Sequence, residues 1–254
     1  MDPEGIREVF LAECGAAADY GTRRALRSLP FPVRFQESFF YGVHLPLTRK
    51  LPKRLDTVMA QRTGLHAYDA IVLADIDPVI FDADDLWNLL AYVEGGGGLL
   101  LMGGPNSFNK AQRGWGPFRE ALPADIDFQP QKKTKLWNTE FKPEPEPTAV
   151  PLVPGSPHPS SLGIDRDVGK VVRFHRLFPK AASSVFASAA GEPILVAWTF
   201  GRGRIVMGAS YPSGHPDCTF RKPAWDNFLR QMLTWLMKRD SDLAVESWEP
   251  GPDS

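Results

Sequence analysis

Two aspartates follow the most apolar strand that the sequence predicts. The segment Tyr68–Asp77 reads YDAIVLADID, and its apolar run Ala70–Ala74 leads directly into Asp75 and Asp77. An uninterrupted run of this kind is typical of a strand buried on both faces of a parallel sheet. Carboxylates at a strand end can bind a divalent cation or orient a sugar hydroxyl, and they also commonly cap the next turn. We expect ligand binding here and predict no metal.

A glycine-rich turn follows the next apolar run. Residues 99–108 read LLLMGGPNSF, so Gly103 and Gly104 come directly after the run, with Asn106 and Ser107 just beyond. Glycines let backbone N–H groups approach an anion, especially where a helix begins. The spacing fits neither the GxGxxG nor the GxxxxGK[ST] motif, so it predicts no dinucleotide and no P-loop. Close backbone packing at a crowded strand end would explain the glycines equally well.

Aromatic side chains could line a pocket for a sugar or a peptide. The candidates are Trp115, Trp137, Tyr211 and Trp225. Trp225 fits the helical spacing of the C-terminal segment, as Trp235 does, and is expected in the core. Trp115 stands between two glycines in a predicted loop, so we expect it to be exposed and available for contact.

These residues need a scaffold, and the first hundred residues predict strands that alternate with helices. Strands are expected at Arg7–Cys14, Phe31–Phe40, Tyr68–Asp77 and Gly98–Gly104. Helices are expected from near Asp19, over residues 51–64 and over residues 82–96. The last has Asp82 or Asp84 as its N-cap and Gly95 or Gly96, within EGGGG, as its C-cap.

This order predicts an α/β fold with a flavodoxin-like, open, mostly parallel sheet and helices on both faces. Ligands of such sheets bind outside the carboxyl ends of the strands, near a topological switch point. Asp75, Asp77 and Gly103–Ser107 all stand at such ends.

The middle of the chain has a different composition. Residues 108–161 are rich in proline and mixed in charge, which predicts a loop-rich insertion with a short helix before residue 123 and one or two short strands near Leu136 and at residues 149–153. Long loops in compact domains are often functional, so segment 129–160 is a candidate for wrapping a partner.

The last third predicts strands at residues 182–190, 192–200 and 203–211, then an amphipathic helix at 222–239. A hairpin turn is expected with Gly201 and Gly203 at positive φ. We therefore predict one domain over residues 1–240, followed by a polar tail at 241–254.

Composition narrows the functional classes. The 254 residues are 43% hydrophobic and 23% charged, with a net charge of −1. This balance allows a sizeable core and gives no support for nucleic-acid or membrane binding. Two distant cysteines, Cys14 and Cys218, make neither a disulfide framework nor a zinc cluster. Without a signal peptide or an apolar stretch of about 18 residues, we expect a cytoplasmic protein.

The order of motifs resembles the class I glutamine-amidotransferase-like superfamily, and more closely its "putative glutamine amidotransferase" and trehalose-utilisation-like groups. The shared features are a strand ending in Asp, a helix, GGGGLLLMGG, a Leu-Pro pair after a short helix, GRGR before a strand, and a Trp-containing C-terminal helix. They span residues 7 to 238, apart from the proline-rich segment.

The resemblance implies a cysteine nucleophile on the turn after the strand GLLLMGG, activated by a base and served by oxyanion donors. That position corresponds to residues 102–105, which are Met, Gly, Gly and Pro, and the first hydroxyl beyond them is Ser107. Glutaminase activity is therefore not expected.

The resemblance also implies a later histidine with an acid two residues on. His215 and Asp217 match this pattern as base and orienter, with Asp in place of the more usual Glu. An ordinary loop histidine is the alternative. Cys218 lies on the same loop rather than on a strand-to-helix turn, so a plain thiol is expected. A metal site would need His215 and Asp217 to converge with Asp75 and Asp77.

Three functions remain open. The first is a catalytically degenerate domain that binds a ligand or a partner, without a cofactor. Its ligand-binding candidates are Asp75, Asp77, Gly103, Gly104, Asn106, Ser107, Trp115 and Tyr211. The second is a cysteine-independent hydrolase or isomerase of a small polar or sugar-like substrate that uses His215 and Asp217. The third is a subunit of an assembly, homomeric or not, joined through the proline-rich segment.

Overall fold

The computed structural model of the chain describes residues 5–14, 20–40, 62–76, 78–104, 107–108, 115–126, 149–162, 168–172, 174–212, 216–238 and 240. Several predictions fall outside these residues, namely those for Asp77, Asn106, Trp137, His215, most of the helix at 51–64, the strand near Leu136 and the tail.

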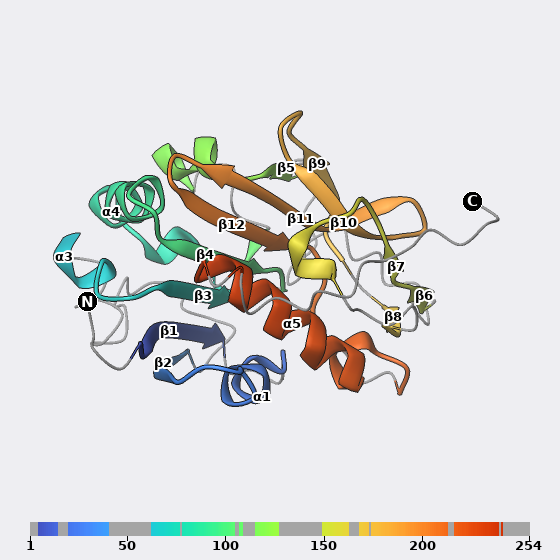
Figure 1. The fold of residues 1–254 in the computed structure, drawn as a ribbon. Helices are drawn as coiled ribbons and strands as arrows, with labels where there is room; N and C mark the ends of the chain where they lie inside the picture. Colours follow the sequence, from blue (N-terminus) through green and yellow to red (C-terminus); the bar gives the residue numbers. More distant parts are fainter. Residues whose placement is uncertain are drawn as a thin grey trace.

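An eight-stranded sheet forms the centre of the molecule (Figure 1). Its strands lie in the order β2-β1-β3-β4-β12-β11-β10-β7. The bounds are Arg7–Cys14 for β1, Val33–Phe40 for β2, Ala70–Ala74 for β3, Gly98–Met102 for β4, Val153–Pro154 for β7, Ser184–Ala189 for β10, Glu192–Phe200 for β11 and Gly203–Gly208 for β12. Pairing is parallel from β2 to β12 and antiparallel from β12 to β7. The predicted mixed α/β fold with a mostly parallel sheet is confirmed.

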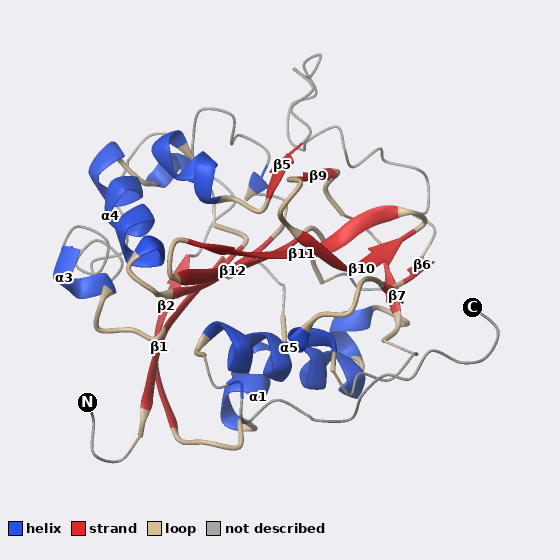
Figure 2. Ribbon diagram, turned by 45° about the horizontal axis from the view of Figure 1, so that its top comes forward, coloured by secondary structure: helices blue, strands red, loops and turns tan. Residues whose placement is uncertain are grey.

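Helices cover both faces of the sheet (Figure 2). Helices α3 and α4 lie on one face, and α1 and α5 lie on the other. Their bounds are Thr22–Arg27 for α1, Arg62–Leu65 for α3, Ala83–Glu94 for α4 and Pro223–Leu236 for α5. The predicted caps of α4 are confirmed: Asp82 and Asp85 form a capping box, and Gly95 is the C-cap.

Shorter elements complete the described chain. Two small antiparallel ribbons pair β5 with β9 and β6 with β8. Their bounds are Ala124–Ile126 for β5, Val150–Pro151 for β6, Lys170–Val171 for β8 and Leu177–Pro179 for β9. The 3-10 turns are η1 at Pro78–Ile80, η3 at Gly116–Ala121, η4 at Pro159–Ser161 and η5 at Thr219–Arg221. The short strands expected near residues 149–153 are therefore present as β6 and β7.

Local details differ from the predictions at two glycines. Gly21, with φ 79°, is the N-cap of α1, so this helix begins at Thr22 rather than near Asp19. In the β11–β12 turn Gly201 has the expected positive φ of 57°, but Gly203 does not. Gly203 is needed for a different reason, because a Cβ atom there would lie 2.1 Å from the carbonyl oxygen of Val93.

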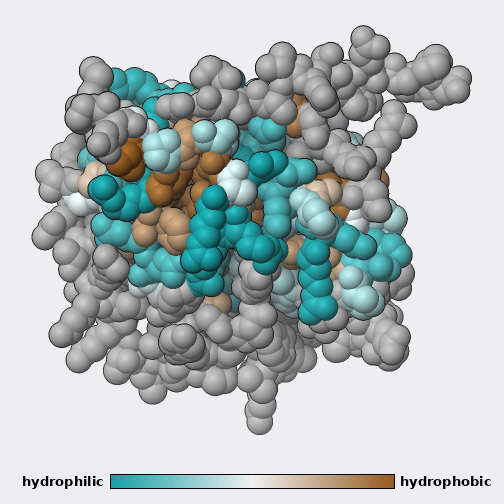
Figure 3. Space-filling model, turned by 60° about the horizontal axis from the view of Figure 1, so that its bottom comes forward, coloured by the Kyte–Doolittle hydropathy of each residue, from teal (hydrophilic) through white to brown (hydrophobic). Residues whose placement is uncertain are grey.

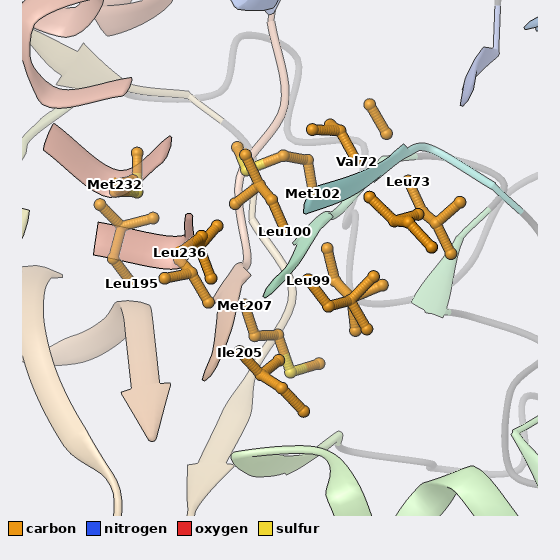
Figure 4. Packing of buried hydrophobic residues seen from close by; sticks show 14 of the residues in the cluster. Val72, Leu73, Leu99, Leu100, Met102, Leu195, Ile205, Met207, Met232 and Leu236 are labelled. Carbon is orange, nitrogen blue, oxygen red and sulfur yellow. The ribbon is translucent and has the colours of Figure 1, made fainter. Parts of the chain in front are cut away.

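The core lies on both sides of β4 (Figure 4). Leu100 and Met102 point toward α5, where Leu236 lies, whereas Leu99 lies on the other side, with Met207. All of these side chains are at most 1% exposed. Burial of each such side chain contributes about 1.5–3 kcal/mol, which is why the uninterrupted apolar run holds the centre of the sheet.

The surface carries both kinds of residue. On the face shown in Figure 3, the largest group of hydrophobic residues lies at the upper left, and smaller hydrophobic areas lie among the hydrophilic residues of the described surface. None of the helices in the described ranges is long and apolar enough to span a membrane.

Candidate functional site

Polar side chains gather where the parallel strands end. The order β2-β1-β3-β4-β12 places the topological switch point between β1 and β3, where open α/β sheets bind ligands. We call this region the carboxyl edge. Its buried polar side chains are Glu13, Asp75, Ser107, His175 and Ser210, each at most 6% exposed. Buried polar groups at a switch point make this region the candidate site.

The glycine turn after β4 is closed on itself. The N–H of Gly103 donates to the carbonyl oxygen of Gly208 at 2.7 Å. The N–H of Gly104 donates to Oγ of Ser107 at 2.7 Å, and the N–H of Ser107 donates back to the carbonyl oxygen of Gly104 at 3.3 Å. Both glycine N–H groups are thus used within the protein, which leaves neither of them for the anion cradle that the sequence suggested.

Asp75 takes the space beside Gly104. Its backbone has φ 56°, in the left-handed region, and its N–H donates to the carbonyl oxygen of Met102 at 2.9 Å. A Cβ atom on Gly104 would lie 2.3 Å from Cγ and Oδ1 of Asp75. Real atoms cannot approach so closely, so residue 104 must be glycine while Asp75 keeps this position. A left-handed aspartate buried at a strand end is strained in a way that is common at functional sites.

His175 covers the same turn from the other side. Its ring is fully buried, its Nε2 lies 3.0 Å from the carbonyl oxygen of Gly104, and it meets the ring of Phe108 edge-on at 5.2 Å. Because a carbonyl oxygen only accepts hydrogen bonds, Nε2 must carry the hydrogen in this contact. A Cβ atom on Gly103 would lie 2.9 Å from Cδ2 of His175. The carbonyl oxygen of Ala209 would lie closer still, at 2.7 Å, so the backbone after β12 and the ring of His175 together explain the second glycine.

Tyr20 joins the loop after β1 to the turn after β4. Its hydroxyl donates to the carbonyl oxygen of Gly103 at 2.7 Å, and its own carbonyl oxygen accepts from Nε1 of Trp225 at 2.8 Å. Burial, and then the negative charges of Asp75 and Glu13, raise the pKa of Tyr20 well above its usual value. The phenol therefore stays protonated at neutral pH and remains a donor.

The chemistry available at this edge is that of acids and hydroxyls. Asp75, Glu13 and Tyr211 all lie near enough to Tyr20 to raise its pKa. Glu13 also forms an ion pair with Arg23 at 3.5 Å. Carboxylates beside phenols accept hydrogen bonds from ligand hydroxyls or amides. Within the described ranges, no three His, Cys, Asp or Glu side chains are arranged to hold a metal ion.

The structure brings some of the predicted residues together. The turn at the carboxyl edge is formed by Gly103, Gly104 and Ser107, and Asp75 lies against it. Tyr211 lies close enough to Tyr20 to contribute to its raised pKa. Asp77, Asn106 and His215 lie outside the described residues.

Two other predicted residues have different surroundings. Asp217 is half exposed and pairs with Lys170 at 3.2 Å and Lys222 at 3.9 Å. The expected exposure of Trp115 is wrong, because its side chain is 1% exposed and packs on Phe118, with ring centroids 5.8 Å apart. Cys14 and Cys218 are both buried, and no disulfide joins them.

Sequence reasoning missed three residues of this edge. Glu13 stands near the end of a correctly predicted strand, so the rule that selected Asp75 would have selected it too. Tyr20 lies in the loop after that strand, where only its type gives a signal. His175 follows no motif, and its contact with Gly104 depends on a chain reversal that the sequence does not reveal.

Comparisons with known proteins identify the family and the fold. A family model described as "Putative glutamine amidotransferase" matches residues 52–238. A comparison with curated proteins finds no match.

Solved structures of similar fold cover nearly the whole chain. A cytoplasmic protein from Salmonella typhimurium LT2 is 22% identical, with a TM-score of 0.65, over 90% of this chain and 98% of that one. A ThuA-like protein from Bacteroides uniformis ATCC 8492 is 10% identical, with a TM-score of 0.57, over 91% of each chain. A beta-galactosidase from Rahnella sp. R3 is 12% identical, with a TM-score of 0.54, over 94% of this chain and 32% of that one. At these identities the likenesses show the fold alone. The family model, in contrast, matches residues 52–238, which is most of the chain, and this match shows that the chain belongs to the glutamine-amidotransferase-like family.

Proposed function

We propose that this chain is a catalytically degenerate glutamine-amidotransferase-like domain that binds a small polar ligand at the carboxyl edge of its sheet. The observation that carries the proposal is the contact between Asp75 and Gly104. The side-chain position that a nucleophile at residue 104 would need is taken by a carboxylate, 2.3 Å from where the Cβ atom would be.

The neighbouring groups support binding rather than acyl transfer. The N–H groups of Gly103 and Gly104 already donate within the protein, which argues against their serving as oxyanion donors. The acidic groups Asp75 and Glu13 favour a neutral ligand that donates hydrogen bonds. A polyol or a sugar is the simplest ligand of this class.

A binding experiment tests this proposal. Thermal unfolding of the full chain is followed with neutral monosaccharides and polyols, and again for Asp75→Asn, which keeps the shape of the side chain and removes its charge. A ligand at a hundred times its Kd stabilises the folded state by about 2.7 kcal/mol. That corresponds to a rise in Tm of roughly 5–10 °C for a domain of this size, which Asp75→Asn is expected to reduce. Failure of every polyol and sugar to raise the Tm would count against this ligand class.

The runner-up function is a cysteine-independent hydrolase or isomerase in the same place. The observation that favours it is that an acid, Asp75, and a histidine, His175, both lie against Gly104. In such an enzyme, His215 and Asp217 would serve as the base and its orienting acid, as the sequence predicts. Turnover of a stabilising sugar that is lost in His175→Gln, while binding persists, would favour this enzyme over a binding domain.

A further inference from the structure

A pocket opens at the edge of the sheet opposite to the candidate site. It lies where β1, β3 and β4 begin and α5 ends, and its volume is about 330 Å³. We call it the amino-edge pocket. Its walls include Arg7, His66, Tyr68, Asp69, Tyr92, Gly95–Gly97 and Lys238, and the carboxylate among them, Asp69, forms an ion pair with Arg7. The glycines are those of the EGGGG run, which the proposed function does not use.

The glycine run lets three side chains converge. A Cβ atom on Gly95 would lie 3.2 Å from Cε1 of His66, and one on Gly97 would lie 2.2 Å from Cζ of Tyr92. On Gly96, a Cβ atom would lie 3.0 Å from Nζ of Lys238. Each missing side chain therefore makes room for a group of the pocket wall.

Lys238 occupies a backbone conformation that favours glycine. It follows the C-cap of α5 with φ 57°, at the position where helices commonly end in glycine or asparagine. Its N–H donates to the carbonyl oxygen of Trp235 at 2.9 Å. A lysine kept in a strained conformation points to a role for its side chain.

The charge of Lys238 is not balanced by its described neighbours. Partial burial, and then the cations Arg204 and Arg202, lower the pKa of Lys238, while Asp240 opposes them. Asp240 itself is held by both guanidinium nitrogens of Arg204, at 2.6 and 2.8 Å. No ion pair of Lys238 occurs within the described part of the chain, so an anion in this pocket would relieve repulsion between cations.

Arg7 lines the pocket and neutralises its carboxylate. Its Nη1 pairs with Oδ1 of Asp69 at 2.6 Å, and Asp69 also accepts from the N–H of Glu8 at 2.8 Å. Its Nε is buried and has no hydrogen-bond partner among the described residues. This N–H is shielded from the open volume of the pocket, so Arg7 contributes the neutralisation of Asp69 and leaves Lys238 as the cation available to an anion.

We propose that the amino-edge pocket binds the phosphate group of a small phosphorylated metabolite, with Lys238 as its counter-charge and the rings of Tyr68, Tyr92 and His66 beside the rest of the molecule. Lysine is a common phosphate ligand because it acts as a compact point charge. The volume is in the range of small-molecule pockets, so it leaves room for more than a free anion. The inference is independent of the ligand at the carboxyl edge.

Inorganic phosphate is the probe that tests this inference. Calorimetric titration and thermal unfolding of the full chain are measured at constant ionic strength, with sodium chloride as the balancing salt. Lys238→Gly removes the ammonium and suits the left-handed backbone, so it is expected to fold and to bind phosphate roughly tenfold more weakly. Lys238→Met, which keeps the body of the side chain, is expected to show the same loss.

Arg221→Met is the matched control, because Arg221 is exposed and lies at the other end of α5. It removes one positive charge and is expected to leave phosphate binding unchanged. Unaltered binding in both Lys238 variants, or equal loss in Arg221→Met, would overturn the assignment. Equal stabilisation by acetate would overturn the phosphate class. None of these outcomes bears on sugar binding at the carboxyl edge, so the two proposals fail separately.

Discussion

Glycines flank β4 at both of its ends, and the two ends use them differently. Before β4, the side chains that replace the missing Cβ atoms are His66, Tyr92 and Lys238, and they surround an open pocket. After β4, the groups that would meet a Cβ atom are buried against the turn: the side chain of Asp75 at Gly104, and the carbonyl oxygen of Ala209 with the ring of His175 at Gly103. A glycine at a strand end is thus no evidence of catalysis by itself. What matters is which group takes the place of the missing side chain.

The largest expected effect comes from filling the carboxyl-edge turn. Gly104→Cys restores the residue type of a nucleophile, but its Cβ atom would collide with Asp75. We expect a loss of more than about 3 kcal/mol in the free energy of unfolding, measured by urea denaturation, because a buried carboxylate must be displaced.

Gly191→Cys is the control for this substitution. Gly191 has φ 79° and no atom within 4 Å of a Cβ atom, so only the backbone strain of about 1 kcal/mol is expected. Combining Gly104→Cys with Asp75→Ala should recover part of the lost stability. Equal costs for the two cysteine variants would show that the turn is not closed by Asp75.

The second-largest expected effect is a pH dependence of stability that comes from His158, which packs against the C-terminal part of α5. His158 is 8% exposed, packs edge-on against Trp235 near the end of α5, and its Nδ1 accepts from the N–H of Ser160. Burial, and then the charge of Arg204, lower the pKa of His158 to about 4. Between pH 6.5, the usual pKa of histidine, and pH 4, the unfolded chain therefore binds a proton at residue 158 more readily than the folded chain does.

The contribution of neutral His158 to the free energy of unfolding is therefore complete above about pH 6.5. It decreases by about 3 kcal/mol as the pH falls from there to 4. His158→Asn keeps a capping acceptor and does not titrate. The difference in unfolding free energy between this variant and the wild type, measured from pH 7 to 4, should change by that amount. A difference that is constant with pH would contradict the buried, neutral histidine.

Two buried tyrosines offer a matched pair. Tyr20 donates to the carbonyl oxygen of Gly103 after β4 at 2.7 Å, and Tyr92 donates to that of Gly98 at the start of β4 at 3.1 Å. Each Tyr→Phe change should cost about 1–2 kcal/mol in unfolding free energy, because a buried carbonyl loses its donor. Tyr20→Phe should also weaken sugar binding, while Tyr92→Phe should not. If a binding titration showed weaker sugar binding for Tyr92→Phe and not for Tyr20→Phe, the sugar would bind near the start of β4 and not at the carboxyl edge.

The smallest effect has the opposite sign. Lys238→Gly should raise the free energy of unfolding by up to about 1 kcal/mol, because glycine adopts the left-handed conformation without strain. Ala190→Gly, at φ 49°, is the control that relieves similar strain in the exposed turn between β10 and β11. A destabilised Lys238→Gly beside a stabilised Ala190→Gly would mean that the lysine contributes to folding rather than to anion binding.

The sheet was predictable because its signals are local. The apolar runs of β3 and β4 and the capping box at Asp82 each specify their own element, and the alternation of strands and helices specifies parallel pairing. The carboxyl edge was only half predictable. Strand ends located Asp75 and the glycine turn, but the contacts of His175 and Tyr20 depend on segments far apart in the sequence. The exposure of Trp115 was wrong because flanking glycines report on the backbone, not on what packs against the ring.

Release of glutamate from glutamine by the purified full chain tests the central claim most directly. With Asp75 closing the turn at Gly104, we predict no release above the rate in a blank without protein, for the wild type and for Asp75→Asn alike. Glutamate release by the wild-type chain that His175→Gln or Asp75→Asn abolishes would show that the carboxyl edge is a working glutaminase, and would contradict the account.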